Sequence, residues 1–225
     1  MINNRLVNIS LIVFGSLSLI FVIFPNLDIE ISGLFYSQGF GFTYKEQPIV
    51  VLFYKTIPIL TKTFVLVCVL YLLYILIKFK SIKKTLSSWA FFLIISAIIA
   101  PGITVNSLLK ENFGRARPRE LVEFGGNKNF SRAFVISDQC PKNCSFTSGH
   151  AAMGYYLSSI AYVAGSLYFA RIYIASIFFG SAVGLSRIIM GGHFASDVII
   201  SAFLVLLLNH LIYLLWTKKT SELKI

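Results

Sequence analysis

Charged residues are scarce in this sequence, and acidic ones are the scarcest. Only 13% of its 225 residues are charged and 56% are hydrophobic, whereas soluble domains carry about 25% charged residues. This shortage excludes a water-exposed globular domain. The 9 acidic and 20 basic residues leave a net charge of +11. In a membrane protein this excess anchors cytoplasmic loops and binds anionic lipid head groups, so we expect no nucleic-acid partner.

Cysteine and N-terminal alanine are scarce as well. No alanine precedes Ala90, which excludes the small-residue cleavage site of a signal peptide, so we expect the first hydrophobic segment to stay as a helix. Cys140 and Cys144 share a polar loop, but no second pair or histidine accompanies them as in a zinc site. A disulfide and two free thiols both remain open, and a periplasmic loop would favour the disulfide.

Long apolar runs dominate the rest of the chain. A bilayer core of about 30 Å requires roughly 20 helical residues, and six stretches reach or approach that length. They are residues 6–24, 57–77, 87–109, 148–170, 172–189 and 193–216. Only helices and closed barrels satisfy the backbone in lipid, and these runs do not alternate as barrel strands do. We therefore predict an all-α polytopic membrane protein, with residues 1–225 forming one domain, a six-transmembrane-helix bundle.

Basic segments predict the orientation of this bundle. The loop 78–84 and the C-terminal tail, which includes Lys224, are rich in lysine and are therefore expected in the cytoplasm. With six spans the N-terminus is cytoplasmic too, and the connections 25–56 and 110–147 lie on the opposite face. Arg171, expected in the turn between the fourth and fifth spans, is then cytoplasmic.

Three polar islands interrupt the apolar runs, at residues 110–118, 148–150 and 186–197. The predicted topology brings all three to the same, non-cytoplasmic membrane surface. They lie at the end of the third span, at the start of the fourth, and where the fifth meets the sixth. This convergence indicates a single functional site.

The third island contains His193 and Asp197, four residues apart and so on one helix face. A carboxylate there can accept one imidazole N–H and leave the other nitrogen as a nucleophile or base. An interfacial ion pair would show the same spacing.

In the second island, Ser148 and Gly149 begin a span beside His150, where free backbone N–H groups attract an anion and glycine permits its close approach. Ordinary helix capping is the alternative.

Three permanent cations, Lys110, Arg117 and Arg187, reach the same surface. They suit the equatorial oxygens of a phosphoryl group in transfer, although anchoring to lipid head groups would also use them. No acidic cluster accompanies them that could hold magnesium or calcium. The two histidines and three cations therefore indicate metal-independent phosphoryl transfer through a phosphohistidine, with no cofactor.

The spacing of these residues resembles the three-part signature of the type 2 phosphatidic acid phosphatase (PAP2) superfamily. The matching segments are K-x6-R-P at Lys110–Pro118, S-G-H at Ser148–His150 and S-R-x5-H-x3-D at Ser186–Asp197. The resemblance implies that His193 is the nucleophile, that Asp197 orients it and that His150 protonates the leaving oxygen. It also implies a phosphate site, formed by Lys110, Arg117, Ser148, Gly149 and Arg187. Thr147 replaces the family's usual proline and can cap the helix instead.

Two further segments, 24–29 and 134–146, are similar to lipid A phosphatases of Gram-negative bacteria, particularly those acting at the 4′ position. The expected function is removal of a phosphate monoester from lipid A at the periplasmic face of the bacterial inner membrane. Phosphatidylglycerol phosphate and undecaprenyl pyrophosphate are alternative substrates, and transfer to a lipid is an alternative to hydrolysis. A protein that only binds or transports anionic lipids would need the cations but not the histidines.

Overall fold

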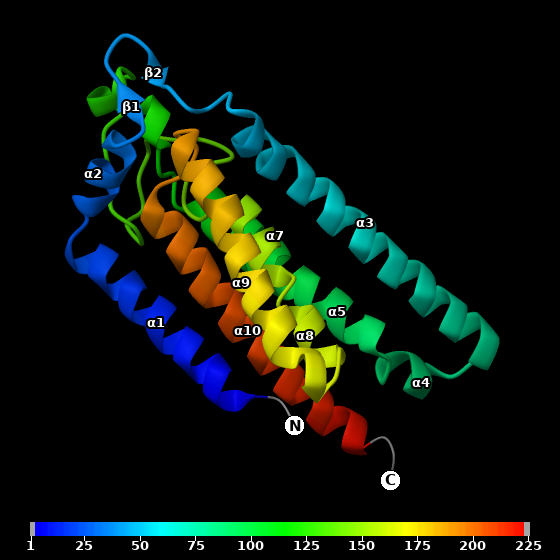
Figure 1. Cartoon of the computed structure of the whole chain (residues 1–225). Coiled ribbons are helices and arrows are strands. Elements are labelled where there is room, and N and C mark those ends of the chain that lie inside the picture. Colours follow the sequence, from blue (N-terminus) through cyan, green and yellow to red (C-terminus); the bar gives the residue numbers. More distant parts are fainter. Residues whose placement is uncertain (1–2, 223–225) are drawn as a thin grey trace.

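The computed structural model describes residues 3–222 and is almost entirely helical, which confirms the predicted all-α class (Figure 1). The helices are α1 (Asn4–Ile23), α2 (Leu27–Gly33), α3 (Pro48–Phe79), α4 (Ile82–Leu86), α5 (Trp89–Ala97), α6 (Lys110–Asn112), α7 (Gly149–Tyr156), α8 (Ser159–Val163), α9 (Ser166–Ile189) and α10 (Ala195–Glu222). A π-helical segment, Ile98–Leu109, joins α5 to α6. Two short strands, β1 (Tyr36–Ser37) and β2 (Gly41–Phe42), pair in antiparallel fashion.

Five helical stretches in the described residues are long and apolar enough to cross a membrane. They are α1, α3, the continuous stretch Trp89–Asn112, α9 and α10. Their outward faces carry unpartnered apolar side chains, such as Ile12 on α1 and Ile59 on α3, each 67% exposed. Such faces require lipid rather than water around them, so the chain is a multi-pass membrane protein.

The predicted fourth span, 148–170, is wrong as a single helix, because the chain breaks it into α7 and α8. Asn209 of α10 donates hydrogen bonds to the Tyr156 carbonyl (3.4 Å) and the Ser158 hydroxyl (3.1 Å), which occupy polar groups at the break. The two short helices still carry the chain from one end of the bundle to the other, between α6 and α9 (Figure 1).

The predicted turn at Arg171 is also wrong. The connection lies earlier, at Gly165, whose φ of 85° is a left-handed conformation that glycine adopts without strain. Helix α9 begins directly after it, so Arg171 lies within that helix rather than in a loop.

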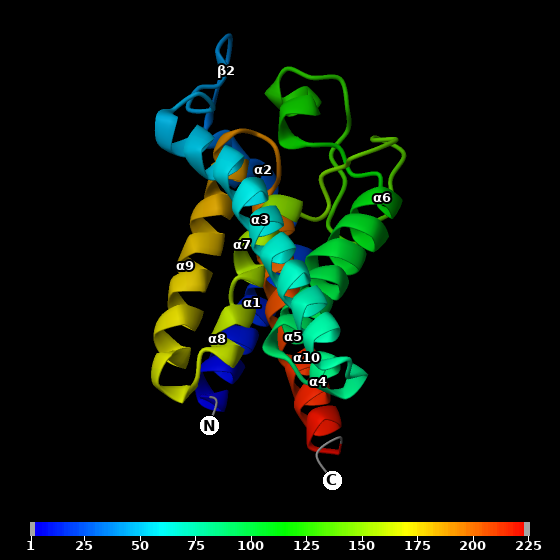
Figure 2. The same cartoon turned by 90° about the vertical axis from the view of Figure 1, so that its right-hand side faces the viewer.

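Both ends of the described chain lie at one end of the bundle, as two independent views show (Figures 1 and 2). Helix α2, the β1–β2 hairpin and the connection after α6 gather at the opposite end. The described part of the chain therefore places residues 25–47 and 113–147 on the same side of the bundle, as the predicted topology requires. Lys224 lies outside the described residues.

Candidate active site

A polar cavity of about 320 Å³ opens at the end of the bundle that carries the hairpin and the long connection. Five of the residues singled out in the sequence line it: Lys110, Arg117, His150, Arg187 and His193. They come from α6, the connection after it, α7, the end of α9 and the loop before α10. The structure thus joins the three polar islands in one cavity, as the predicted convergence requires.

His193 is 1% exposed and directs its Nδ1 atom away from the cavity. Nδ1 lies 2.7 Å from the backbone oxygen of Ser145. Because a carbonyl only accepts hydrogen bonds, the neutral imidazole carries its proton on Nδ1 and keeps the lone pair on Nε2. Burial lowers the pKa of His193 to about 3, against the opposing effect of Asp197 and with a smaller contribution from Arg187. The ring is therefore neutral at physiological pH and presents a nucleophilic nitrogen.

Asp197 is fully buried behind His193, but its nearer oxygen, Oδ2, lies 3.6 Å from Nδ1. This arrangement differs from the direct imidazole–carboxylate hydrogen bond expected from the sequence. Both carboxylate oxygens already have closer partners. Oδ2 accepts from the Ser145 hydroxyl (2.6 Å) and the Phe194 backbone N–H (2.9 Å), and Oδ1 accepts from Arg115 (2.7 Å). Asp197 thus orients the ring together with Ser145.

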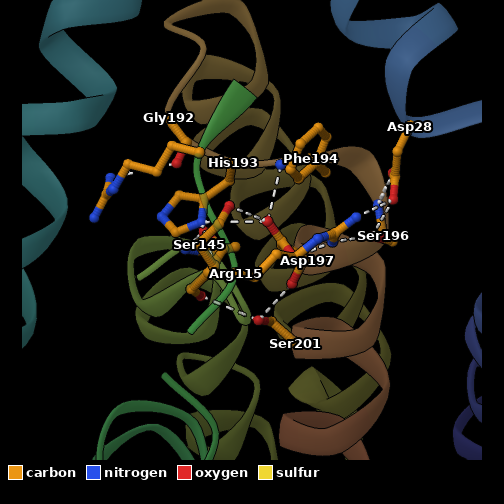
Figure 3. Close-up of polar contacts among 12 residues, drawn as sticks. Asp28, Arg115, Ser145, Gly192, His193, Phe194, Ser196, Asp197 and Ser201 are labelled. Carbon is orange, nitrogen blue, oxygen red and sulfur yellow. Dashed lines mark hydrogen bonds and ion pairs between the residues drawn. The ribbon is translucent and has the colours of Figure 1, made fainter. Parts of the chain in front are cut away.

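Arg115 and Asp28 complete this buried network (Figure 3). The sequence motifs include Asp28 only as part of the segment 24–29 and assign neither residue a role in the site. Arg115 is 0% exposed and donates to Asp197 through Nη1 and to Asp28 (2.8 Å) through Nη2. Ser196 also binds both residues, since its hydroxyl donates to Asp28 (2.6 Å) and accepts from Arg115 (2.8 Å). One signal was available: Asp28 is an acidic residue beside an apolar span in a chain with few acidic residues.

The three cations that line the cavity differ from one another in how their side chains are held. Arg117, 7% exposed, donates to the backbone oxygens of Asn143 (2.6 Å) and Gly192 (3.3 Å), which fix its guanidinium at the rim. Arg187, 4% exposed, has no hydrogen-bond partner for its buried Nε within the described residues. Lys110 forms no ion pair in the same part of the chain. Unpaired positive charge therefore faces the cavity.

Tyr54 of α3 is another cavity residue that the sequence did not single out. Its ring stacks on His150 at 4.9 Å between centroids, and the Arg187 guanidinium lies 4.5 Å from its centre. The aromatic face fixes the plane of the imidazole and favours the cation above it. Helix α3 thereby supplies one wall of a cavity that the sequence motifs assign only to the later spans.

The structure does not place Ser148 and Gly149 in the lining of the cavity. The Ser148 hydroxyl accepts from the Ala151 backbone N–H at 3.4 Å and so caps α7. A Cβ atom at Gly149 would lie 2.5 Å from Asn106 Oδ1, so a larger residue there would force the Asn106 side chain of the π-helical segment to move. Both residues lie behind His150 and fix where its helix begins.

The loop between Cys140 and Cys144 is closed by a disulfide and borders the cavity. Asn143, within this loop, holds Arg117, and Ser145, directly after it, holds His193. The constrained loop therefore positions both the Arg117 guanidinium and the His193 imidazole. Within residues 3–222 no group of three His, Cys, Asp or Glu side chains is arranged to hold a metal ion.

A multi-pass helical bundle with two histidines facing three cations in one cavity defines a membrane-embedded phosphatase. The chain belongs to the PAP2 superfamily, whose model matches residues 89–221. It is 35% identical to a lipid A 4'-phosphatase of Francisella tularensis subsp. novicida over 88% of this chain and 90% of that protein.

Two further relatives cover less of the chain. A lipid A 4'-phosphatase of Rhizobium leguminosarum is 36% identical over 46% of this chain and 44% of its own length. A lipid A 4'-phosphatase of Rhizobium etli is 37% identical over 45% of this chain and 39% of its own length. No solved structure matches the chain. These relatives and the family together support a lipid phosphatase that hydrolyses phosphoric monoesters.

Proposed function

We propose that this chain removes the 4′-phosphate from lipid A at the periplasmic face of a bacterial inner membrane, through a phosphohistidine on His193. The observation that carries the proposal is the cavity in which His150 and His193 face Lys110, Arg117 and Arg187. The name of the Francisella relative, similar over 88% of the chain, supplies the substrate.

The scissile phosphate binds among the three cations. Arg187 uses its buried Nε, which has no partner within the described residues, to donate to a phosphate oxygen. Arg117 and Lys110, which line the same cavity, neutralise the remaining charge. This places phosphorus in front of Nε2 of His193, because Nδ1 is occupied by the Ser145 carbonyl.

Hydrolysis then takes two steps. In the first, Nε2 of His193 bonds to phosphorus as the bond from phosphorus to the sugar oxygen breaks. His150, protonated once the phosphate dianion has offset the charges of the three cations, donates a proton to that oxygen. In the second, water attacks phosphorus, His150 takes its proton, and inorganic phosphate leaves as the bond to Nε2 breaks. Asp197, 3.6 Å from the ring, and the Ser145 carbonyl stabilise the positive imidazole in between.

A second cavity, of about 520 Å³, favours a lipid with a bulky sugar head group as the substrate, rather than a lipid with a small head group such as phosphatidylglycerol phosphate. It shares Tyr54, Arg119 and Met190 with the catalytic cavity. Its other walls include two aromatic rings, two lysines and one carboxylate: Phe42, Phe124, Lys45, Lys55 and Glu46, which lies 4.0 Å from Lys45. This mixture of flat apolar faces and cations suits a phosphorylated sugar, whose second ring would lie there while the first enters the catalytic cavity.

The test is turnover by the purified protein in detergent micelles, with lipid A, phosphatidylglycerol phosphate and undecaprenyl pyrophosphate compared at equal concentration. We expect lipid A to react fastest, with release of free phosphate and with tandem mass spectra that locate the loss at the 4′ position. EDTA should leave the rate unchanged, because side-chain cations supply the charge at phosphorus. Faster turnover of another lipid would refute the substrate, and a phosphorylated lipid product in place of free phosphate would indicate a transferase.

A further inference from the structure

Asp28 lies far from the signature in sequence and outside the matched residues 89–221, yet it is buried against the candidate active site. It belongs to the first turn of α2 and is 1% exposed. Its Oδ1 accepts from the Ser196 backbone N–H at 2.9 Å, and its Oδ2 accepts from the Ser196 hydroxyl at 2.6 Å. Asp28 therefore holds the first turn of α10, which carries Asp197.

Arg115 links the two carboxylates. Its guanidinium lies 2.8 Å from Asp28 Oδ2 and 2.7 Å from Asp197 Oδ1, and it rests on the Phe194 ring at 4.1 Å. Its Nε donates to the Ser131 carbonyl at 2.8 Å, so each guanidinium nitrogen has an acceptor. A buried charge needs such pairing, and here one cation is shared between two anions.

We propose that Asp28, acting through Arg115 and Ser196, is a positioning residue that keeps Asp197 correctly placed behind His193 and offsets part of the positive charge of Arg115. This inference rests on the proposed function, in which His193 is the nucleophile. With Asp28 present, two carboxylates share one guanidinium, so the net charge behind His193 stays negative and stabilises the imidazole when it becomes positive. Without it, the whole guanidinium charge acts on Asp197, and the first turn of α10 loses its anchor on α2.

A residue that positions Asp197 behind His193 should affect stabilisation of the transition state more than it affects substrate binding. The residues that face the phosphate, Lys110, Arg117 and Arg187, do not contact Asp28 or Arg115 through any hydrogen bond or ion pair in the described residues. Vanadate bonded to a nucleophile resembles the transition state, whereas inorganic phosphate resembles the bound product. The two inhibitors therefore separate positioning of His193 from integrity of the phosphate site.

The experiment compares Asp28→Asn, which keeps the shape but removes the charge, with Ser32→Ala as a matched control. Ser32 lies on the same helix, is fully buried, and its hydroxyl has no partner in the described residues. In Asp28→Asn we expect kcat to fall about tenfold and the vanadate inhibition constant to rise about tenfold, with KM and the phosphate inhibition constant within about twofold. In Ser32→Ala, kcat, KM and the inhibition constants for vanadate and phosphate should all stay within about twofold of wild type.

Ser196→Ala provides a second variant should Asp28→Asn not fold. It removes the hydroxyl between Asp28 and Arg115 but leaves both charges, so we expect the same pattern at about threefold. Unchanged kcat and vanadate binding in the folded variant would overturn the inference. So would equal weakening of vanadate and phosphate together with a lowered Tm, which indicates a purely structural role. An active His193→Ala enzyme would instead refute the proposed function and, with it, the role of Asp28.

Discussion

At the scale of single residues, the two histidines differ in their surroundings and hence in their expected roles. His193 is 1% exposed and hydrogen-bonded through Nδ1, whereas His150 is half-buried and stacks on Tyr54. A rigidly held lone pair suits a nucleophile that must approach phosphorus in line. A ring at the cavity wall, open to the leaving oxygen and to water, suits proton transfer in both directions.

The first prediction separates these roles by substitution. His193→Ala should lower turnover by at least about 10³-fold with every substrate, since no phosphoenzyme can form. His150→Ala should lower it about 10²-fold with lipid A but much less with an aryl phosphate, whose leaving group needs no proton. Trapping of labelled phosphohistidine with an alkaline quench, under which the acid-labile P–N bond survives, checks this: label should accumulate in His150→Ala and be absent from His193→Ala.

The second prediction concerns the protonation state of His193. Because burial lowers its pKa to about 3, protonation requires a pH near that value, and the neutral form persists as the pH falls through the physiological range. Nitrogen-15 spectra of the labelled imidazole should show the Nδ1–H form from about pH 8 down to about pH 5. Assignment comes from the spectrum of His193→Ala. A titration midpoint of His193 near its ordinary value would contradict the desolvated site.

At the scale of structural elements, short irregular segments position the chemistry more than the long helices do. The loop closed by Cys140 and Cys144 leads into Ser145, whose backbone oxygen and hydroxyl contact His193 and Asp197. Its Asn143 holds Arg117 through the backbone oxygen. Loss of the covalent closure should therefore affect the proposed nucleophile and the proposed phosphate site together.

The third prediction tests this loop with the double variant Cys140→Ser/Cys144→Ser. Closing so short a loop contributes about 2 kcal/mol by the chain-entropy model, so the bundle should stay folded with a modestly lower Tm. We expect kcat to fall several-fold as Ser145 becomes more mobile. Dithiothreitol should produce the same loss in wild type and none in the double variant. Full activity of the folded double variant would show that the loop needs no covalent closure.

The fourth prediction concerns the second cavity, formed by the hairpin and α3. Lys45→Gln/Lys55→Gln removes two exposed cations, each worth about 0.2–1 kcal/mol to an anionic head, so KM for lipid A should rise about two- to thirtyfold. An aryl phosphate, which fills only the catalytic cavity, should be unaffected. Lys83→Gln/Lys84→Gln removes the same charge at the opposite end of the bundle and serves as the control. Equal KM values for lipid A in the two double variants would exclude the second cavity as a sugar site.

At the scale of the whole molecule, orientation in the membrane decides which lipids the active site can reach. The described chain separates the lysines of α4 from the catalytic cavity by the length of the bundle (Figure 1). The positive-inside rule predicts that the α4 end is cytoplasmic, and therefore that the cavity opens at the periplasmic face.

The fifth prediction tests this orientation with single cysteines in a cysteine-free background. Glu123→Cys, exposed at the cavity end, should react with a membrane-impermeant thiol reagent once the outer membrane is permeabilised. Lys83→Cys, exposed in α4, should react only after the inner membrane is opened. The reverse pattern would place the active site in the cytoplasm and remove periplasmic lipid A as its substrate.

The sequence by itself determined the class of fold and five charged or imidazole side chains of the cavity lining. Apolar runs can satisfy their backbone in lipid only as helices, so composition alone led to an all-α membrane bundle. The alternation of spans then brought three polar islands to one surface, which identified Lys110, Arg117, His150, Arg187 and His193 before any contact was known.

Only the tertiary structure decided which other side chains contact those residues. Arg115 and Arg117 are two positions apart in the same loop. Arg115 is buried and bonded to Asp197, whereas Arg117 lines the cavity, a difference set by the path of the backbone. Asp28 and Tyr54 reach the site from α2 and α3 through packing between distant segments, which no local spacing records. Hydrophobic runs specify that helices form, whereas the partners of a buried charge depend on which segments the folded chain brings within hydrogen-bonding distance.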